Sequence, residues 1–554
     1  MPLRRRLPVS VLFILVLPIL RAEDPPAPAT TVHECVILTS VFAPDGNPRS
    51  GLRAENPDLP EFVVPRSTAW GPVRYGVRDT LDAEDLRTAP VTQSFDAWCA
   101  WIGAESPTGV KVKARLPNGL WTRWCPSAES SPKVPAKAKG LPGGVLDWGL
   151  LQVSPAAANP GMQGRVPKAP LGSAWASARA ASRSYLETSR GASRMTDQFL
   201  FARGVADFPG PLGAAVTETL EVSLTNRGDQ PLPRAWVLWV PPSELGGRFP
   251  ADPFQASALA QPVAALAAGE QRTVPFEGVT PGRPIDLAQT LAAEIEKALV
   301  ESGLLPAEAR AALRFGREAW FFTPGVRVLY LIPRAFADRT LPLEIQPAPR
   351  EHVRVWIGCA EVLDPDRERA IEETLAAYLD SLQTDPYAML EQYRLKLLRE
   401  GRFLEPILRS IAATTENAPV AGLAKKIAGA LANPSVEEAP LLGPDSVVLP
   451  DADALALRSD PARRRERIAA LTTWIERWHA YAEKTKCDAT GVADARIELR
   501  LLQWLEEKQA DGTAGAGGPS GDDLAIPDSL RMLPLRPSTC GCTRARETGE
   551  MPRE

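Results

Sequence analysis

Proline occupies 55 of the 554 positions in this chain, about twice its ordinary share of ~5%. A proline lacks the backbone N–H that helices and central strands use, and its fixed φ suits turns and chain ends. We therefore expect short strands, turns and stiff connections rather than long uninterrupted helices. At roughly 150 residues per domain, a chain of this length also predicts several domains.

The composition excludes several classes of protein. Hydrophobic residues make up 44% and charged residues 23% of the chain, which are the proportions of an ordinary globular protein. A wholly disordered chain, a polytopic membrane protein and a fibrous repeat are therefore excluded. The 63 Lys and Arg residues nearly balance the 67 Asp and Glu residues, so no overall positive field attracts nucleic acid, and we expect no nucleic-acid partner.

The first 22 residues have the pattern of a signal peptide. Arg4, Arg5 and Arg6 precede an apolar run over residues 9–20, and this order of cationic and apolar regions is typical of export. The run is too short for a membrane-spanning helix, which needs about 20 apolar residues. We therefore expect an exported protein, periplasmic or extracellular, with no transmembrane segment once the leader is removed.

Residues 110–125 predict a β-hairpin with one cationic face. Apolar residues alternate with Lys111, Lys113 and Arg115 before the turn at residues 117–119, as expected for strands with one wet face. Together with Trp121 and Arg123 on the returning strand, this face is a candidate binding site for an anionic polymer. The alternative interpretation is the ordinary solvent-facing side of a half-buried hairpin.

The chain has seven cysteines, and export makes disulfide bonds feasible. Cys99 and Cys125 lie in similar contexts, AWCAW and TRWCP, and form the disulfide candidate. An odd total leaves at least one thiol unpaired within the chain.

Residues 213–280 carry the alternation and turn signals of a β-sandwich. Leu220, Val222 and Leu224 lead into a turn at residues 226–229, and the apolar run 235–240 follows, so a second hairpin is expected. A later turn has the sequence LAAGE. These motifs resemble the immunoglobulin-like modules of bacterial secreted and surface proteins. The resemblance implies a β-sandwich used for spacing, packing or adhesion, with no inherent chemistry.

The next segment mixes helices and strands. Pro284 and Asp286 open a helix with apolar residues every four positions, which Gly303 ends, and two β-branched strands follow at residues 326–332 and 353–362. The segments FFTPGVRVLYLIPR and DQFLFARGV resemble uncharacterised exported proteins of GC-rich bacteria. That resemblance implies export and no particular activity.

These patterns predict a multidomain fold with a β-rich N-terminal part that includes an immunoglobulin-like sandwich, a small α+β unit and an α-helical C-terminal part. The expected divisions are a signal peptide (1–22), a Pro-rich linker (23–31), a β-rich domain (32–206), the sandwich (207–284), the α+β unit (285–362), a helical unit (363–432), a Pro-rich linker (433–460), a helical hairpin (461–508) and a disordered tail (509–554).

No sequence motif indicates a reaction. The three histidines His33, His352 and His479 lie in different expected units, and HExxH, GxSxG, the P-loop motif and CxxC are absent. We expect no cofactor and no metal, and the catalytic residues, if any, stay unknown. The leading hypothesis is a non-catalytic binding or scaffold protein that contacts a protein partner through its helical C-terminal part. The alternatives are an exported hydrolase that uses a carboxylate pair on glycan or peptide, and a polyanion-binding protein.

The leader pattern predicts that the N-terminal segment is removed during export. When the gene is expressed with its own leader in a bacterial host, we expect intact-mass and N-terminal peptide spectra to show that residues 1–22 have been removed, because the short apolar run directs export and cleavage. Recovery of Met1 on soluble cytosolic protein would contradict the expectation.

Overall fold

The computed structural model describes residues 30–50, 60, 62–65, 91–130, 141, 143–169, 173–188, 194–241, 251–363, 365–381, 404–432 and 460–485, together with 495, 496, 499, 502, 503 and 506. The expected signal peptide, the tail from 509 and nearly all of both Pro-rich linkers lie outside these residues. The described chain is β-rich in its N-terminal part and helical in its C-terminal part, as the sequence predicts.

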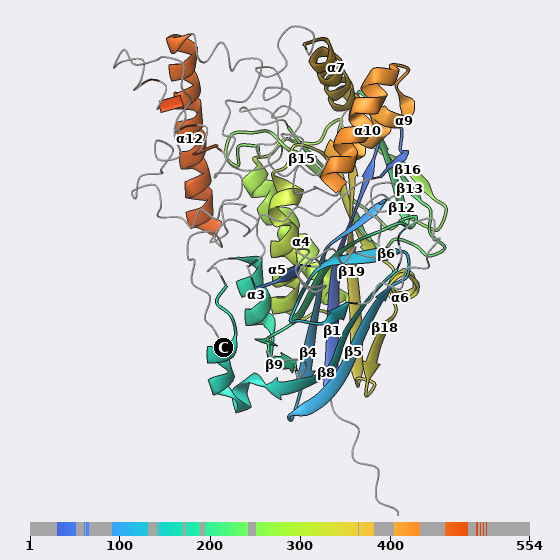
Figure 1. Ribbon diagram of the computed structural model, residues 1–554, viewed down its shortest axis with the longest axis vertical. Helices are drawn as coiled ribbons and strands as arrows, with labels where there is room; N and C mark the ends of the chain where they lie inside the picture. Colours follow the sequence, from blue (N-terminus) through green and yellow to red (C-terminus); the bar gives the residue numbers. More distant parts are fainter. Residues whose placement is uncertain are drawn as a thin grey trace, which may run out of the picture.

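One long sheet forms the centre of the described structure (Figure 1). Its order is β15 (Leu259–Val263), β14 (Ala235–Val240), β17 (Gly325–Ile332), β19 (Glu351–Val362), β1 (Thr30–Phe42), β4 (Gln93–Ala104), β11 (Leu200–Ala206), β6 (Gly119–Cys125) and β3 (Val64–Pro65), and β2 (Pro48–Arg49) pairs with β1. The central strands β1 and β4 are buried almost throughout their length.

The long sheet consists of two halves that come from different parts of the chain. The strands from β1 to β3 in the sheet order come from residues 30–206, and those from β15 to β19 come from residues 235–362. The halves join where β1 and β19 run parallel, with Thr31 opposite Glu351 and Phe42 opposite Val362. The expected boundaries near residues 206 and 284 therefore do not separate independent sheets.

Two smaller sheets cover one face of the long sheet. The β5–β8 sheet has the order β10 (Thr196–Asp197), β9 (Ser184–Thr188), β8 (Gly144–Pro155), β5 (Thr108–Leu116) and β18 (Leu343–Gln346), with β7 (Glu129–Ser130) beside β8. The β12–β13 sheet contains β12 (Leu212–Val216), β13 (Val222–Asn226) and β16 (Gln271–Val274). One apolar core, which includes Trp98, Trp148 and Leu224, lies between these sheets and the long sheet.

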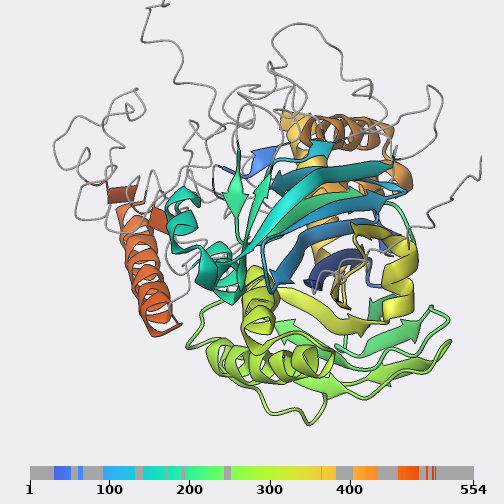
Figure 2. The ribbon, with the colours of Figure 1, turned by 90° about the horizontal axis from the view of Figure 1, so that it is seen from below.

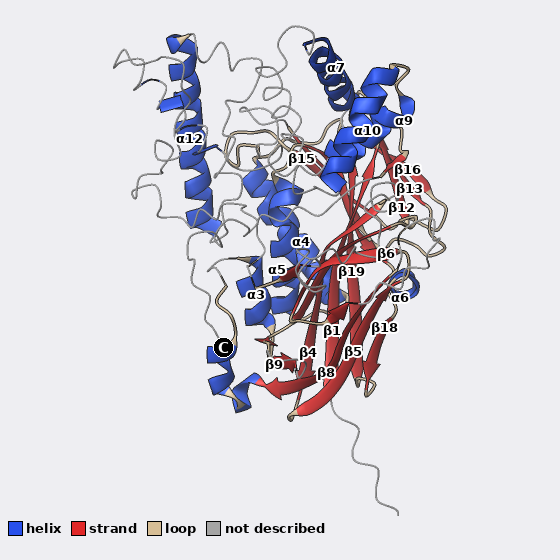
Figure 3. Ribbon diagram, viewed as in Figure 1, coloured by secondary structure: helices blue, strands red, loops and turns tan. Residues whose placement is uncertain are grey.

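Helices cover the opposite face of the long sheet and one end of the strands (Figure 3). The helices beside the sheet are α3 (Ala174–Ala181), α4 (Pro284–Glu301) and α5 (Pro306–Phe321). A separate small core is formed by α7 (Pro365–Ser381), α9 (Leu404–Thr414) and α10 (Ala418–Ala432). The short helical elements are η2 (Ala156–Ala158), η3 (Pro160–Arg165) and α6 (Arg334–Thr340). Figure 2 shows α12 (Pro461–Thr485) on the same side of the strands as α3.

The helix predicted to begin at Pro284 is confirmed. In α4 the side chains of Leu291, Ile295 and Leu299 are buried against the sheet, because a spacing of four residues places them on one face. Gly303 follows the helix with a φ of 111°, a conformation that glycine adopts without strain. No helix among the described residues combines the length and the apolar character needed to cross a membrane.

Both hairpins expected from the sequence are instead connections between layers. The strand β5 belongs to the β5–β8 sheet, while β6 belongs to the long sheet; likewise β13 and β14 lie in different sheets. The strands of each expected hairpin have an apolar side; in the first, this side includes Val112 on β5 and Trp121 on β6. Packing the two apolar sides face to face buries both, whereas pairing the strands edge to edge would leave both on one surface of a single sheet.

A buried ion pair links the two halves of the long sheet. Glu34 on β1 lies directly opposite Arg354 on β19, and the guanidinium donates to both carboxylate oxygens at 2.6 and 3.0 Å. The indole of Trp356 donates to the same carboxylate at 3.1 Å. The side chain of Glu34 is 0% exposed, so each charge depends on its partners for stabilisation.

Removal of the buried carboxylate charge is expected to destabilise the fold. For Glu34→Gln we expect the free energy of unfolding to fall by about 3–5 kcal/mol, because Arg354 stays buried, loses its buried counter-charge and keeps only the half-exposed Asp338 as an acidic partner. Urea denaturation followed by circular dichroism measures the change. The matched control is Glu105→Gln, whose carboxylate pairs with Arg350 on the surface with 68% of its side chain exposed, and which we expect to cost less than about 1 kcal/mol. Equal losses in the two variants would contradict the expectation.

A second buried polar pair joins the sheet to the helix layer. His33 Nδ1 on β1 lies 2.7 Å from Glu308 Oε2 on α5, and the same carboxylate oxygen accepts the backbone N–H of Leu305 at 2.9 Å. Burial by itself lowers the pKa of His33, but the hydrogen bond and charge of Glu308 outweigh it, so that the pKa lies above its usual value.

This raised pKa predicts a pH-dependent contribution to stability. Because the folded state holds the His33 proton more tightly than the unfolded state, the contribution is complete below about pH 6.5 and is lost as the pH rises through the folded pKa. We expect His33→Gln to remove this component, so that the wild type loses its advantage over the variant as the pH rises above about 6.5. Denaturation midpoints measured on both sides of that pH test this, with His352 and His479 present in both proteins. An advantage that grows with pH would contradict it.

Candidate functional site

The predicted cationic face lies on the outer side of the β5–β8 sheet. Lys111 and Arg115 are exposed and Lys113 is half-buried. Acidic neighbours compensate this face: Lys113 Nζ lies 3.1 Å from Asp147 on β8, and Arg115 Nε lies 2.6 Å from Glu344 on β18. Two of the three cations on this face therefore pair with carboxylates, which reduces the positive charge that the face presents to a polyanion.

The structure separates the other two residues of the predicted polyanion site from this face. Trp121 and Arg123 belong to β6 in the long sheet, whereas the cations belong to β5. The side chain of Trp121 is 0% exposed, so its ring offers no stacking surface for a ligand. Expecting Trp121 in a surface site was wrong because smaller sheets and helices cover both faces of its sheet.

The expected Cys99–Cys125 disulfide is not formed. Both residues are buried free thiols. Cys99 lies on β4 and Cys125 on β6, and Phe201 of β11 lies opposite both of them. The intervening strand places their Cα atoms about 9–10 Å apart, beyond the ~7 Å that a disulfide bond tolerates.

A pocket lies where β17 ends before β19 does. Ile332 of β17 pairs with Trp356, after which Pro333 leads into α6. Residues 351–355 of β19 continue to pair with β1 on one side. On the other side, no strand of the described chain continues β17, which leaves this short segment as a strand edge.

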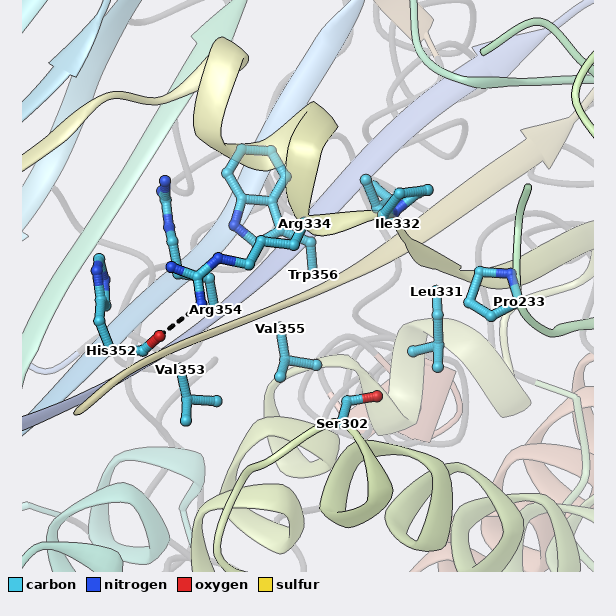
Figure 4. Close-up of a pocket in the computed structure, with 11 residues that line it drawn as sticks. Pro233, Ser302, Leu331, Ile332, Arg334, His352, Val353, Arg354, Val355 and Trp356 are labelled. Atoms are coloured by element: carbon cyan, nitrogen blue, oxygen red, sulfur yellow. Dashed lines mark hydrogen bonds between the residues drawn. The ribbon is translucent and has the colours of Figure 1, made fainter. Parts of the chain in front are cut away.

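The pocket beside this edge has a volume of about 290 Å³, and we call it the β19 pocket. Its lining consists of Pro233, Ser302, Leu331, Ile332, Pro333, Arg334, His352, Val353, Arg354, Val355 and Trp356. Figure 4 shows that Val353 and Val355 point to one side of β19, and that His352, Arg354 and Trp356 point to the other. The pocket therefore combines an apolar wall with a polar one.

The two arginines of the β19 pocket have different environments. Arg354 is held by Glu34, by Asp338 at 2.8 Å and by the carbonyl of Leu341 at 2.8 Å. Arg334 is more than half exposed; its Nη1 donates to the His352 carbonyl at 2.6 Å, and its Nε lies 3.4 Å from Asp338. Arg334 is thus the cation of this lining that faces solvent.

His352 adds a half-buried ring to the polar wall. Burial is the main cause that lowers the pKa of His352, and the positive charges of Arg354 and Arg334 lower it further against the opposing effect of Glu34. The ring is therefore neutral near pH 7. Its Nε2 atom has no hydrogen-bond partner among the described residues.

The geometry of the β19 pocket suits binding better than catalysis. Ser302 lies below β19 in Figure 4 while the His352 ring lies on the other side, and the Ser302 hydroxyl donates to the Ala298 carbonyl at 2.8 Å. A base must contact its nucleophile to activate it. The lining contains no Asp or Glu, so the pocket lacks the paired carboxylates that glycoside hydrolysis requires.

The local sequence patterns did not predict the β19 pocket. The signal that was available is Arg354 within the apolar run VRVWIG, because a charge in an otherwise buried strand requires a buried counter-charge. The contributions of Pro233, Ser302 and Arg334 carry no comparable signal, since they come together only in the folded chain. No group of three His, Cys, Asp or Glu side chains that could hold a metal ion occurs in the part of the chain that the structure describes.

The sequence matches no protein-family model and no curated protein.

Proposed function

We propose that this protein is an exported, non-catalytic binding protein of the bacterial envelope or exterior, and that the β19 pocket binds an extended segment of a protein partner. The observation that carries the proposal is the early end of β17, which leaves residues 351–355 of β19 as a strand edge beside a pocket. The leader pattern at residues 4–20 supports the exported location.

An extended peptide fits this edge because it would continue the line of β17. The carbonyl of His352 already accepts a hydrogen bond from the Arg334 side chain that lies in the pocket, so backbone groups of β19 are directed to this side. Peptides that add to a sheet edge gain affinity from main-chain hydrogen bonds and specificity from pockets for alternate side chains. The strand edge is short, so the peptide would add only a few residues.

The two walls of the pocket indicate which side chains the peptide carries. Val353, Val355 and Leu331 offer apolar contact, and the exposed guanidinium of Arg334 offers a charge-assisted hydrogen bond. We therefore propose an acidic side chain next to an apolar one. Contact of a partner with the helical C-terminal part stays a prediction.

We also propose that residues 207–284 are an immunoglobulin-like sandwich incorporated into the larger fold. In support, Leu224 of the β12–β13 sheet and Val237 of the long sheet share one apolar core. The two turn motifs also meet, because the Asn226 amide donates to the carbonyls of Leu266 and Ala267 at 3.1 and 3.0 Å. Such a module would position the β19 half of the sheet without chemistry of its own.

Peptide selection tests the proposed binding. Purified full-length protein is used to select from a phage-displayed library of random peptides, and the enriched peptides are measured by isothermal titration calorimetry. We expect enriched peptides to share an acidic residue beside an apolar one. We expect Kd to rise about tenfold for Arg334→Glu, through charge reversal, and for Ser302→Trp, through steric filling of the pocket.

The matched control is Arg339→Glu on the same helix. Arg339 is exposed, pairs with Asp229 at 3.0 Å and lies outside the pocket lining, so it should leave Kd unchanged. Circular dichroism confirms that each variant is folded. Failure to enrich any peptide, or equal Kd values for all three variants, would refute peptide binding at this pocket.

A further inference from the structure

Three cysteines lie in one row across the long sheet. Cys35 on β1 pairs with Cys99 on β4, Cys99 pairs with Phe201 on β11, and Phe201 pairs with Cys125 on β6. All four side chains belong to the core on the helix-covered face. The row therefore brings thiols from distant parts of the sequence to the same side of the sheet.

The spacing in this row distinguishes one pair of cysteines from the others. Directly opposite residues on antiparallel neighbours have Cα atoms about 4.5 or 5.5 Å apart, and a disulfide accepts about 4.4–6.8 Å. Cys35 and Cys99 are free thiols in this structure, and their pairing meets this requirement. The strand β11, with Phe201, lies between Cys99 and Cys125. The two strands β4 and β11 lie between Cys35 and Cys125. Neither of those pairs therefore meets the distance requirement of a disulfide.

We propose that Cys35 and Cys99 are a disulfide site that cross-links β1 to β4 while the chain folds. The oxidant is a disulfide compound of an oxidising compartment, such as oxidised glutathione or a protein disulfide. Two S–H bonds break and one S–S bond forms between the cysteines. The two electrons and two protons pass to the oxidant, whose own S–S bond is reduced to two thiols.

The burial of both residues determines when this oxidation takes place. Each of the two residues is 2% exposed in the folded chain, and burial, together with nearby charge, raises the pKa of both thiols. A thiolate is the attacking species in disulfide exchange. The bond therefore forms before the helices α3, α4 and α5 cover this face of the sheet.

In the cell this oxidation rests on the proposed export, because cytosolic thiols are kept reduced. The register of β1 and β4 does not depend on export. An experiment with purified protein therefore tests the site separately from the location.

The experiment is oxidative refolding followed by mass spectrometry. Full-length protein is unfolded, reduced, refolded with a mixture of reduced and oxidised glutathione, alkylated, and digested without reduction. We expect a cross-linked peptide that joins Cys35 to Cys99, and a thermal midpoint roughly 5 °C above that of protein refolded with reductant, because the bond restricts a long loop of the unfolded chain. Native protein given the same mixture should cross-link far more slowly.

Two serine variants control the assignment. Cys125→Ser should retain the cross-link, whereas Cys99→Ser should lose it without a substitute bond between Cys35 and Cys125. The proposal is overturned if protein that refolds to the native circular dichroism spectrum contains no Cys35–Cys99 bond, or if Cys99 is joined to Cys125. Reduced thiols in protein from cells, together with the bond after refolding, would refute the exported location and leave the site intact.

Discussion

The parallel pairing of β1 with β19, fastened by the buried Glu34–Arg354 ion pair, holds the described structure together. These strands are about 320 positions apart along the chain and lie at the join of two half-sheets. Parallel neighbours need long crossover connections, and here the connection contains most of the other strands. A one-residue slip would separate Glu34 from Arg354 and would move each apolar side chain of β1 to the opposite face. The buried charges thus specify the register as well as linking the strands.

The same ion pair shapes the β19 pocket. Arg354 and Trp356 both contact the Glu34 carboxylate, so they form a fixed wall and leave Arg334 as the cation that faces solvent. The pocket itself exists because β17 turns into α6 at Pro333, which lacks the N–H that a continuing strand would use. β19 therefore pairs with β1 along one edge, and beside this pairing residues 351–355 leave its other edge without a partner strand in the described chain.

The local sequence predicted the positions of strands and helices well, but it predicted poorly which strands pair with each other. Alternation identified β5 and β13, a continuous apolar run identified β14, and the spacing of apolar residues identified α4, because these patterns reflect which side chains are buried. The expected hairpins failed because a short loop between two strands does not state whether they pair at their edges or pack at their faces. The cationic residues of β5 were placed correctly at the surface, whereas Trp121 and the Cys99–Cys125 pair were not, because their positions depend on strand order.

The sequence by itself determined the leader pattern, the β-rich and helical parts, and the absence of a local catalytic motif, since each of these depends on residues that are close together along the chain. Tertiary structure alone decided that Cys35 lies opposite Cys99, that Glu34 neutralises Arg354, and that Ser302, Arg334 and Val355 line one pocket. Those contacts connect residues separated by dozens to hundreds of positions. Many strand orders satisfy the same apolar alternation, and only the packing of all the layers together selects one of them.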